Sequence, residues 1–504
     1  MKKVVKIIFI SILLIILFPL YASTENIPWY KDAVFYEIFV RSFADSDGDK
    51  VGDLIGLTQK INYLNTGSKE SENDLKIDAI WLMPIFSSVS YHGYDVTDYY
   101  DINPEYGILE DFENFISEAH KRGIKVILDL VVNHTSSKHP WFISASSSYT
   151  SPYRDYYVWS TQKPDKGPVN LWYQKPTGYY YALFWSEMPD LNFDNPKVRE
   201  EVKKIAKFWI EKGVDGFRLD AAKHIYDENY KNISWWQEFY SYLRGIKPDI
   251  YLVGEVWDNE FTIAEYYKGL PSNFNFPLSD KIISSVANQK DLGIVEFINY
   301  ERDLFRENNS DFADAIFLRN HDQNRVKTGF GGNIDKAILA ASIYLTLPGT
   351  PFIYYGEEIG MEGAKPDEYI REPFKWTDNM KSPEQTYWIK PFYNLPNNGT
   401  SVETLDKDPK SILNQYRKLI RSRINHKALA LGDIEKVKTK DNSTLAYIRY
   451  YGDEKILVIH NLNRIQNTFS LKDTIQEIIY LRNVILNENE LILEPFSTAI
   501  VKIP

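Results

Sequence analysis

Short apolar runs recur along most of the chain, and stretches with apolar residues at a helical spacing separate several of them. One such stretch, residues 109–122, ends at Gly123, and the next apolar run begins at once. Alternation of strand and helix is typical of a parallel sheet. The runs predicted to be strands cover residues 33–40, 77–83, 124–132, 214–219, 251–257, 273–278, 315–319 and 350–355. Eight such strands with intervening helices predict a (β/α)8 TIM barrel of the α/β class.

Two regions depart from this alternation. Residues 135–187 are rich in Ser, Tyr, Trp, Lys and Pro with little periodicity, which predicts an insert after the third strand. From residue 429 onward, strand-like runs are separated by Gly, Asn and Asp, which predicts a small all-β domain. The predicted divisions are a leader at 1–22, barrel segments at 23–134 and 188–428, the insert at 135–187 and the C-terminal domain at 429–504.

The N-terminus has the pattern of a secretory signal peptide. Lysines at positions 2 and 3 precede a nearly unbroken apolar run over residues 7–17, and small residues follow near Ala22. The run is short for a membrane span. We therefore expect removal of residues 1–22, secretion, and no stable membrane association afterwards. Retention as an uncleaved anchor is the alternative.

Composition narrows the classes of function. The net charge of -11 gives a surface that repels nucleic-acid phosphates, so we expect no nucleic-acid partner. The absence of cysteine excludes disulfides, thiol catalysis and thiolate metal sites. The 36 tyrosines, 27 phenylalanines and 12 tryptophans supply flat faces on which sugar rings can stack, although most will lie in the core. We expect a monomer.

A run of acidic residues follows the first predicted strand. Asp45, Asp47, Asp49 and Asp53 fall on alternate positions, and Val51 interrupts the series. Carboxylates this close repel one another unless a cation lies between them. Oxygen ligands at this spacing suit Ca²⁺, with the Val51 carbonyl as a further ligand. A solvated acidic turn is the alternative.

Polar residues follow several predicted strands where those strands end. In a (β/α)8 barrel, the C-terminal ends of all strands meet on one face, and active sites form there. Acids, histidines and amides at four strand ends are therefore expected to converge. The residues concerned are Asp129, Asn133, His134, Arg218, Asp220, His224, Glu255, His321 and Asp322.

Arg218 and Asp220 stand at the end of the fourth predicted strand. Because they are two residues apart, they are expected to emerge on the same face. A neighbouring arginine lowers the pKa of a carboxyl group, so Asp220 is expected to stay ionised and to suit the role of a covalent nucleophile. For this segment by itself, a structural ion pair at a strand end is the alternative.

Four segments together resemble the characteristic regions of the α-amylase family of glycoside hydrolases. They are Asp-Leu-Val-Val-Asn-His at 129–134, Gly-Phe-Arg-Leu-Asp-Ala-Ala-Lys-His at 216–224, Gly-Glu-Val-Trp at 254–257 and Phe-Leu-Arg-Asn-His-Asp at 317–322. The resemblance covers nearly everything after the leader. It implies that residues 135–187 form the family's inserted domain B and that the C-terminal domain is an antiparallel β-sandwich.

The resemblance also implies roles for individual residues. Asp220 would be the nucleophile, Glu255 the general acid and base, and Asp322 the group that grips sugar hydroxyls in the transition state. A second calcium held by Asn133, a carboxylate of the insert and the His224 carbonyl is a further implication. The residues that would line the subsite at the cleaved bond are Tyr94, His134, Arg218 and His321.

The chemistry of glycosidic cleavage fits two of these acids. Its oxocarbenium-like transition state needs an acid on one side and a carboxylate on the other, roughly 5–5.5 Å apart in retaining enzymes. Glu255, sheltered near other acids, is expected to have a raised pKa and to stay protonated.

Further segments bear on the substrate. Lys223 and His224 resemble the pair that binds glucose on the leaving-group side in true α-amylases, which favours cleavage of internal α-1,4 bonds of starch and maltodextrins through a covalent intermediate. Residues 188–192 are intermediate, because they resemble the oligo-1,6-glucosidase type of this segment and also that of a mixed subgroup that includes α-amylases. Residues 45–53 resemble oligo-1,6-glucosidases and cyclomaltodextrinases. An oligo-1,6-glucosidase, a cyclomaltodextrinase or neopullulanase-like hydrolase, and a 4-α-glucanotransferase are the alternatives. An inactive barrel that binds carbohydrate or assists its transport is a distant one, because this chain keeps all three acids.

Overall fold

A closed barrel forms the centre of the molecule. The computed structural model describes residues 27–165, 169–487 and 490–504, and within them eight parallel strands pair in the order β1-β13-β12-β11-β10-β9-β5-β2. Each strand overlaps one predicted run, so the predicted fold class is confirmed. The strands are β1 (Phe35–Ile38), β2 (Ala79–Leu82), β5 (Lys125–Leu130), β9 (Gly216–Leu219), β10 (Tyr251–Gly254), β11 (Ser272–Phe274), β12 (Ala313–Phe317) and β13 (Thr350–Tyr354).

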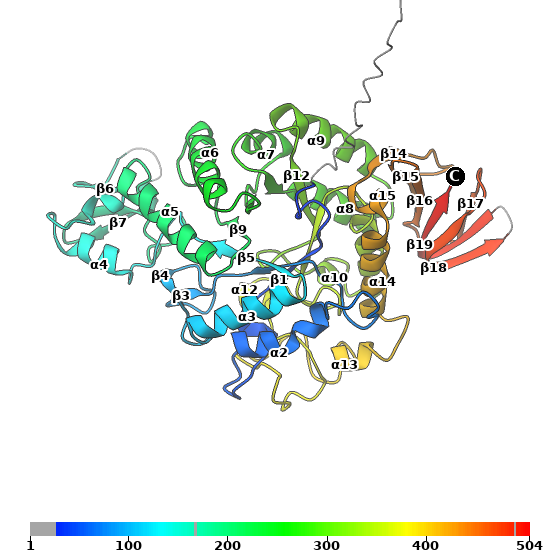
Figure 1. Cartoon of the computed structure of the whole chain (residues 1–504), viewed down its shortest axis with the longest axis horizontal. Coiled ribbons are helices and arrows are strands. Elements are labelled where there is room, and N and C mark those ends of the chain that lie inside the picture. Colours follow the sequence, from blue (N-terminus) through cyan, green and yellow to red (C-terminus); the bar gives the residue numbers. More distant parts are fainter. Residues whose placement is uncertain (1–26, 166–168, 488–489) are drawn as a thin grey trace, which may run out of the picture.

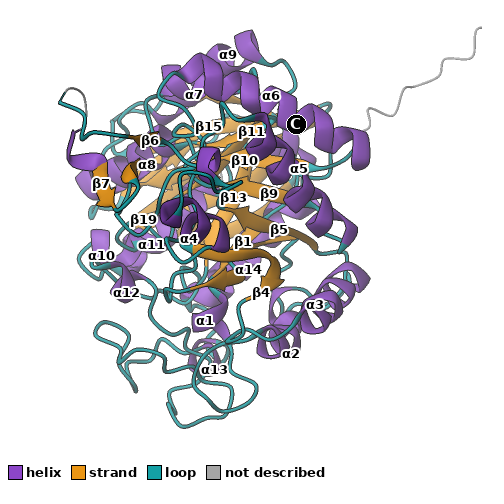
Figure 2. Ribbon diagram, turned by 90° about the vertical axis from the view of Figure 1, so that its left-hand side faces the viewer, coloured by secondary structure: helices purple, strands orange, loops and turns teal. Residues whose placement is uncertain are grey.

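Helices surround these strands, as Figure 2 shows. The strands are covered on both faces, by helices outside and by packed rings such as Phe35 on Phe352 inside, which explains their continuous apolar runs. The helices are α1 (Val40–Phe43), α2 (Leu54–Leu64), α3 (Leu109–Lys121), α5 (Pro196–Glu211), α6 (Asn229–Ile246), α7 (Glu260–Tyr266), α8 (Phe276–Asn288), α9 (Ile294–Asn308), α10 (Val326–Gly329), α11 (Ile334–Tyr344), α12 (Asp367–Ile370), α13 (Val402–Leu405), α14 (Ile412–Asn425) and α15 (Lys427–Leu431).

The sixth barrel strand is shorter than its predicted range. β11 ends at Phe274 because Asn275 caps α8, its side chain accepting a hydrogen bond from the Leu278 N–H at 2.9 Å. Pro277 lies in the first turn of α8, where the missing N–H of a proline costs no helical bond. Residues 276–278, predicted as strand, therefore form the start of a helix.

The insert is a small domain with an antiparallel sheet in the order β6-β8-β7. The Phe142 and Trp159 rings stack at 5.8 Å, and the Arg154 guanidinium lies over Trp159, so Trp159 holds the insert together. An isolated bridge between His134 and Asp190 joins the insert to the barrel. Its elements are α4 (Pro140–Ser147), η1 (Arg154–Tyr156), β6 (Trp159–Ser160), η2 (Val169–Leu171), β7 (Trp172–Lys175) and β8 (Gly178–Tyr181), and the hairpin before α3 consists of β3 (Phe86–Ser88) and β4 (Val96–Ile102).

The C-terminal domain is an antiparallel sheet in the order β14-β15-β16-β19-β17, with β18 paired to β19. This confirms the predicted all-β domain. The buried Arg449 ties it to the barrel side by donating to the Gly432 carbonyl at 2.8 Å and to the Thr346 carbonyl. Figure 1 shows this sheet and the insert at opposite ends of the molecule. The strands are β14 (Asp433–Lys436), β15 (Thr444–Tyr451), β16 (Glu454–Asn461), β17 (Asn467–Ser470), β18 (Glu477–Asn487) and β19 (Glu490–Ile503).

The predicted signal peptide, residues 1–22, lies outside the described residues. In the part of the chain that is described, the helices all lack the length or the apolar character needed to cross a membrane.

Asp215 is a buried carboxylate that joins α3, β5 and α6. Its oxygens accept hydrogen bonds from Lys247 Nζ at 2.7 Å, from Lys125 Nζ at 3.1 Å and from the Val126 N–H at 3.0 Å, and His120 Nε2 lies 2.7 Å away. Burial opposes its charge, but these hydrogen bonds and cations hold the pKa of Asp215 well below its ordinary value.

We expect Asp215→Asn to lower the free energy of unfolding by about 2–4 kcal/mol at pH 7, because Lys125 and Lys247 lose a buried anionic partner. Since the folded pKa is depressed, the wild-type advantage is complete above the unfolded pKa of about 3.9 and is lost as the pH falls further, through the folded value. Urea denaturation at pH 7 and pH 3 measures both effects. Asp303→Asn, at an exposed pair with Arg306, is the matched control. Equal losses of unfolding free energy in Asp215→Asn and Asp303→Asn would contradict the stabilising role of the buried Asp215 carboxylate.

Candidate active site

A cleft of about 600 Å³ opens at the C-terminal end of the barrel. Asp220 follows β9, Glu255 follows β10 and Asp322 lies beyond β12, and all three line the cleft with Tyr94 and His134. The structure therefore brings together acids and polar groups from separate strand ends. The other lining residues are His92, Phe184, Trp185, Met188, Ala221, Trp257, Lys365, Asp367 and Arg371.

The Arg218 guanidinium joins the acids at the base of the cleft. Its Nη1 donates to Asp129 Oδ1 at 2.7 Å and to Asp220 Oδ1 at 2.6 Å, and its Nη2 lies 2.8 Å from Glu255 Oε2. Asp129 and Arg218 are register partners on β5 and β9, and Asp220 is two residues further on. Because Asp220 and Glu255 contact two nitrogens of one planar group, they flank one small volume, as the nucleophile and acid of a retaining glycosidase must.

The pKa of Asp220 is shifted in the direction opposite to the predicted one. Burial raises the pKa of Asp220, and Arg218 opposes that rise without cancelling it. The prediction that Arg218 keeps Asp220 ionised took no account of Asp129 and Glu255, which share the same guanidinium. Burial also raises the pKa of Glu255, against Arg218 and with the help of the nearby carboxylates, which suits a general acid.

The pKa of Asp322 is shifted downward, in contrast to those of Asp220 and Glu255. Although burial favours its neutral form, His321 and Arg371 hold the pKa of Asp322 well below its usual range. Arg371 Nη2 donates to Asp322 Oδ1 at 2.9 Å, and His321 Nε2 lies 3.0 Å from Asp322 Oδ2. Asp322 therefore stays ionised over the range in which the other two acids can take up protons.

Tyr94 and His134 lie on the wall formed by the loops after β2 and β5. The Tyr94 hydroxyl donates to Asp129 Oδ2 at 3.1 Å and lies 2.6 Å from His321 Nε2. His134 Nε2 lies 3.0 Å from the Tyr94 carbonyl oxygen, and burial lowers the pKa of His134 to about 4. These residues and Arg218 thus surround the acids, where the resemblance had implied a subsite.

Lys223 and His224 lie on the side of the cleft formed by Glu255 and Trp257. Lys223 Nζ donates to the Trp257 carbonyl at 2.8 Å and to Asp258 Oδ2 at 3.0 Å. The His224 ring meets Phe184 edge-on, with centroids 5.7 Å apart, and burial lowers the pKa of His224. An ion pair therefore holds the lysine in place next to the cleft.

Half-exposed aromatic rings border the cleft on this side. Trp257 stacks on Phe276 with centroids 4.7 Å apart and rings 8° from parallel, which directs its free face to the cleft. Phe184 and Trp185, at the end of the insert, are each 50% exposed. Flat apolar faces in a polar cleft suit stacking of sugar rings. Trp185 thus lies where a substrate would contact it, whereas Trp159 is packed inside the insert.

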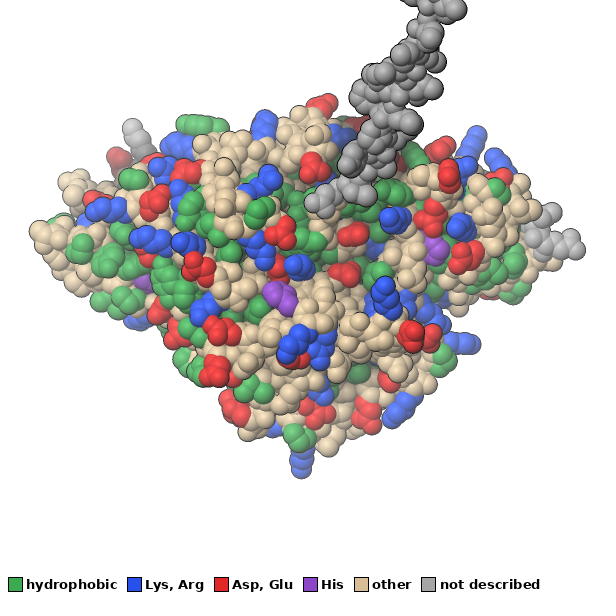
Figure 3. Space-filling model, in the orientation of Figure 1, with side chains coloured by type: hydrophobic (Ala, Val, Ile, Leu, Met, Phe, Trp, Pro, Cys, Tyr) green, Lys and Arg blue, Asp and Glu red, His purple; other side chains and the backbone are tan. Residues whose placement is uncertain are grey.

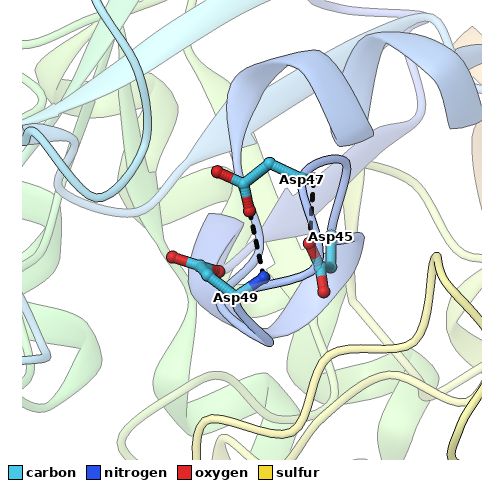
Figure 4. Close-up of side chains that lie close together, drawn as sticks. All are labelled: Asp45, Asp47 and Asp49. Carbon is cyan, nitrogen blue, oxygen red and sulfur yellow. Dashed lines mark hydrogen bonds between the residues drawn. The ribbon is translucent and has the colours of Figure 1, made fainter.

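The acidic loop lies between α1 and α2, and Figure 4 shows three of its side chains. Carboxylate oxygens of Asp45, Asp47 and Asp49 lie within 4.8 Å of one another. Burial raises the pKa of Asp49, and the charges of Asp47 and Asp45 add to that rise. Three hard oxygen donors that repel one another fit the ligand preference of Ca²⁺.

Asp53 and Val51, the other predicted ligands, are placed differently. Asp53 Oδ1 accepts a hydrogen bond from the Gly56 N–H at 2.7 Å as the N-cap of α2, and its Oδ2 accepts one from the Ser46 N–H at 2.8 Å. The Val51 N–H donates to Asp49 Oδ1 at 2.7 Å. Three of the four predicted side chains therefore bring carboxylate oxygens together, while the Asp53 carboxylate accepts backbone hydrogen bonds, as the Asp45 carboxylate also does from the Gly48 and Lys50 N–H groups.

The two groups identified for a second calcium, Asn133 and the His224 carbonyl, lie close together, and the Asp190 carboxylate, just beyond the insert, lies beside Asn133. Asn133 Nδ2 donates to the His224 carbonyl at 2.6 Å. Asp190, at the return from the insert, is buried, and its Oδ1 accepts a hydrogen bond from the Leu183 N–H at 2.9 Å. Burial raises the pKa of Asp190 to about 8. Hydrogen bonds within the protein thus engage all three groups.

Two buried residues of the site were not predicted from the sequence. Glu37 lies inside an apolar run, and strand alternation places it on the interior face of the barrel with Phe35. Because carboxylates are rarely buried without a partner, a glutamate at such a position could have indicated a functional residue. Arg371 lies in the loop beyond β13, where no periodicity or motif marks it.

Comparisons with known proteins agree with this geometry. The family described as Alpha amylase, catalytic domain, matches residues 37–432, and the Alpha-amylase SusG C-terminal domain matches residues 444–500. Alpha-amylase 3 of Dictyoglomus thermophilum is 70% identical, with 100% of this chain and 99% of that protein covered. A 4-alpha-glucanotransferase of Thermotoga neapolitana is 38% identical over 86% of this chain and 96% of that protein. The crystal structure of an alpha-amylase from H. orenii matches with a TM-score of 0.87 and 45% identity, covering 94% of this chain and 100% of that one.

The closed barrel and the acids at its C-terminal end define an enzyme that cleaves glycosidic bonds. With the catalytic-domain match over residues 37–432 and the 70% identical relative, the chain belongs to the α-amylase family of glycoside hydrolases.

We expect Asp220→Asn to fold normally and to lose at least about 1000-fold in turnover, because an amide cannot form the glycosyl ester. Release of reducing ends from maltoheptaose measures the loss, and the melting temperature and calcium content verify the fold. A variant with wild-type turnover and unchanged calcium content would overturn the assignment of the nucleophile.

Proposed function

We propose that the protein hydrolyses internal α-1,4-glucosidic bonds of starch and maltodextrins with retention of configuration. The observation that carries this proposal is the sharing of the Arg218 guanidinium by Asp220 and Glu255, at 2.6 and 2.8 Å. That arrangement sets a nucleophile and an acid against one sugar position. Similarity to the α-amylases of D. thermophilum and H. orenii supports a starch-type substrate.

The reaction proceeds in two steps. Protonated Glu255 gives its proton to the glycosidic oxygen while the Asp220 carboxylate attacks the anomeric carbon, so the bond to the leaving chain breaks and a glycosyl ester forms. Glu255, now ionised, then takes a proton from water, whose oxygen attacks the same carbon and releases Asp220. One glycosidic bond and one water are consumed, and both carboxyl groups return to their starting states.

Other side chains support the transition state and the substrate. Asp322 stays ionised and grips sugar hydroxyls, and its attraction grows as positive charge develops at the anomeric carbon. Lys223 and His224 bind the leaving-group side of the chain, and Trp257 stacks on a sugar ring there.

Transfer to a second sugar is the other candidate. Trp257, Phe184 and Trp185 present half-exposed rings beside the leaving-group residues, where a sugar acceptor can bind in place of water. The 38% identical 4-alpha-glucanotransferase of T. neapolitana supports testing this reaction.

Maltoheptaose, pullulan and isomaltose separate these functions. We expect the first products of maltoheptaose to be shorter chains from interior bonds, and isomaltose to remain intact, because the leaving-group residues favour α-1,4 chains. Chromatography of early time points measures this. Chains longer than the substrate would favour transfer, and isomaltose cleavage would favour the α-1,6 alternative. No turnover of any of the three would favour an inactive, carbohydrate-binding barrel.

We infer that Asp45, Asp47 and Asp49 bind one Ca²⁺, which fixes the loop between α1 and α2. The convergence of the three carboxylates supports this, because a divalent cation relieves their repulsion. An ion held by these residues would lie in a loop whose residues do not line the catalytic cleft, and it would stabilise the loop rather than take part in the reaction.

Removal of calcium with EDTA is expected to lower the melting temperature, because a ligand bound to the folded state stabilises it. Asp47→Asn combined with Asp49→Asn should abolish both this response and the bound calcium measured by atomic emission. Asp53→Asn is the matched control, since asparagine caps a helix as well as aspartate does. Retention of calcium by the double variant would contradict the site, and its loss from Asp53→Asn would add Asp53 to the ligands.

We further propose that the protein is secreted as a monomer after removal of residues 1–22. The basic start, the short apolar run and the small residues near Ala22 support export. N-terminal sequencing of the exported protein distinguishes cleavage from retention as an anchor, and light scattering measures the oligomeric state.

A further inference from the structure

Glu37 is a carboxylate in the middle of the first barrel strand. It is 2% exposed, and alternation along β1 sets it on the interior face with Phe35. Tyr36, between them, points outward, where its hydroxyl donates to Glu358. A buried charge inside a barrel strand is costly unless it has a partner.

The partner of Glu37 is the imidazole of His321. Glu37 Oε1 lies 2.5 Å from His321 Nδ1, and on the other side of the ring Nε2 lies 3.0 Å from Asp322 Oδ2 and 2.6 Å from the Tyr94 hydroxyl. Carboxylates thus face both ring nitrogens. The Tyr94 hydroxyl gives its own proton to Asp129, so its hydrogen bond with Nε2 needs a proton on Nε2. Glu37 accepts a hydrogen bond from Nδ1 only if that nitrogen carries a proton as well, so these contacts together favour the doubly protonated ring.

The groups packed around the ring favour the same protonation state. Burial disfavours the cation, but the charges of Asp322 and Glu37 overcome it and raise the pKa of His321 to about 9. Arg371 Nε donates to the His321 carbonyl rather than to its ring, and the edge of the ring meets Trp81. Three further titratable or charged groups lie in this layer. Asp129 on β5 contacts the Tyr94 hydroxyl, and Arg218 on β9 contacts Asp129, so both act on the ring through Tyr94. Tyr354 on β13 is the register partner of Glu37.

We propose that Glu37 is a positioning residue for catalysis, which keeps the His321 ring doubly protonated and oriented so that its positive charge faces Asp322 while its Nε2 proton holds the Tyr94 hydroxyl. The proposal rests on the function proposed above. In this arrangement Glu37 acts through His321, and His321 sets the rotamer and charge of the acid that grips the sugar. A neutral ring would no longer offset the negative charge of Asp322.

The substitution Glu37→Gln separates charge from shape. The glutamine amide can donate to Nδ1, so the ring can lose the proton there and still keep its Nε2 proton on the Tyr94 hydroxyl. The requirement for a cationic ring then disappears while the side-chain volume stays the same. Glu358→Gln is the matched control, because Glu358 is a fully buried acid that contacts Tyr36 and Tyr63 on the outer side of the same strand, away from the cleft.

Protonation is read directly by nuclear magnetic resonance on protein labelled at histidine Cε1. The chain has 8 histidines, and the His321 signal is the one lost in His321→Asn. We expect the wild-type ring to remain doubly protonated through pH 8. In Glu37→Gln it should titrate at least about two pH units lower, and Glu358→Gln should match the wild type. An unchanged titration in Glu37→Gln would overturn the proposal.

Kinetics supplies the second readout. At pH 8 we expect Glu37→Gln to reduce kcat by about tenfold or more with a smaller change in KM, and the deficit should narrow at pH 5, where the ring is protonated in both proteins. A wild-type pH profile, or a loss equal to that of Glu358→Gln, would overturn the proposal. The titration of His321 needs no substrate. If the proposed function is wrong, the wild-type protein will be inactive on the substrate, but the histidine titrations of the wild type and of Glu37→Gln will still test the role of Glu37.

Discussion

One guanidinium holds the cleft together. The Arg218 side chain is buried in the barrel mouth and contacts three carboxyl groups, from Asp129, Asp220 and Glu255. Without a cation among them, these buried acids would repel one another and force water into the barrel. A lysine is a poor substitute, because only the planar fork of arginine offers several donors in fixed directions. The pairing of β5 with β9 fixes this fork, so strand register and catalytic geometry depend on each other.

Most of the barrel could be predicted because its strands are covered on both sides and appear as unbroken apolar runs. The positions of Asp220, Glu255 and Asp322 followed from their places at strand ends. The end of β11 could not be predicted, since Asn275 can continue a strand or cap a helix, and the contacts of the folded chain decide between them. The sharing of Arg218 also escaped prediction, because sequence spacing relates it to Asp220 and only barrel closure brings in Glu255.

Segments far apart in the sequence complete the cleft. Phe184 and Trp185 come from the end of the insert, whereas Asp367 and Arg371 come from the start and the C-terminal cap of α12, beyond the last barrel strand. The insert has its own aromatic core, so it can present two half-exposed rings without unfolding. On the face drawn in Figure 3, acidic and basic side chains are interspersed. An uncharged polymer does not need a concentrated electrostatic patch, because stacking and hydrogen bonds in the cleft recognise it.

The chain ends on β19, in the sheet that lies at the far end of the molecule from the insert (Figure 1). Two of the rings that border the cleft, Phe184 and Trp185, come from the insert, and no described residue of the C-terminal sheet lines the cleft. A tether fused after Pro504 would therefore attach the protein through a domain that does not line the cleft. The C-terminus is thus the natural point for coupling this enzyme to a solid support or a second domain when the substrate is a bulky granule.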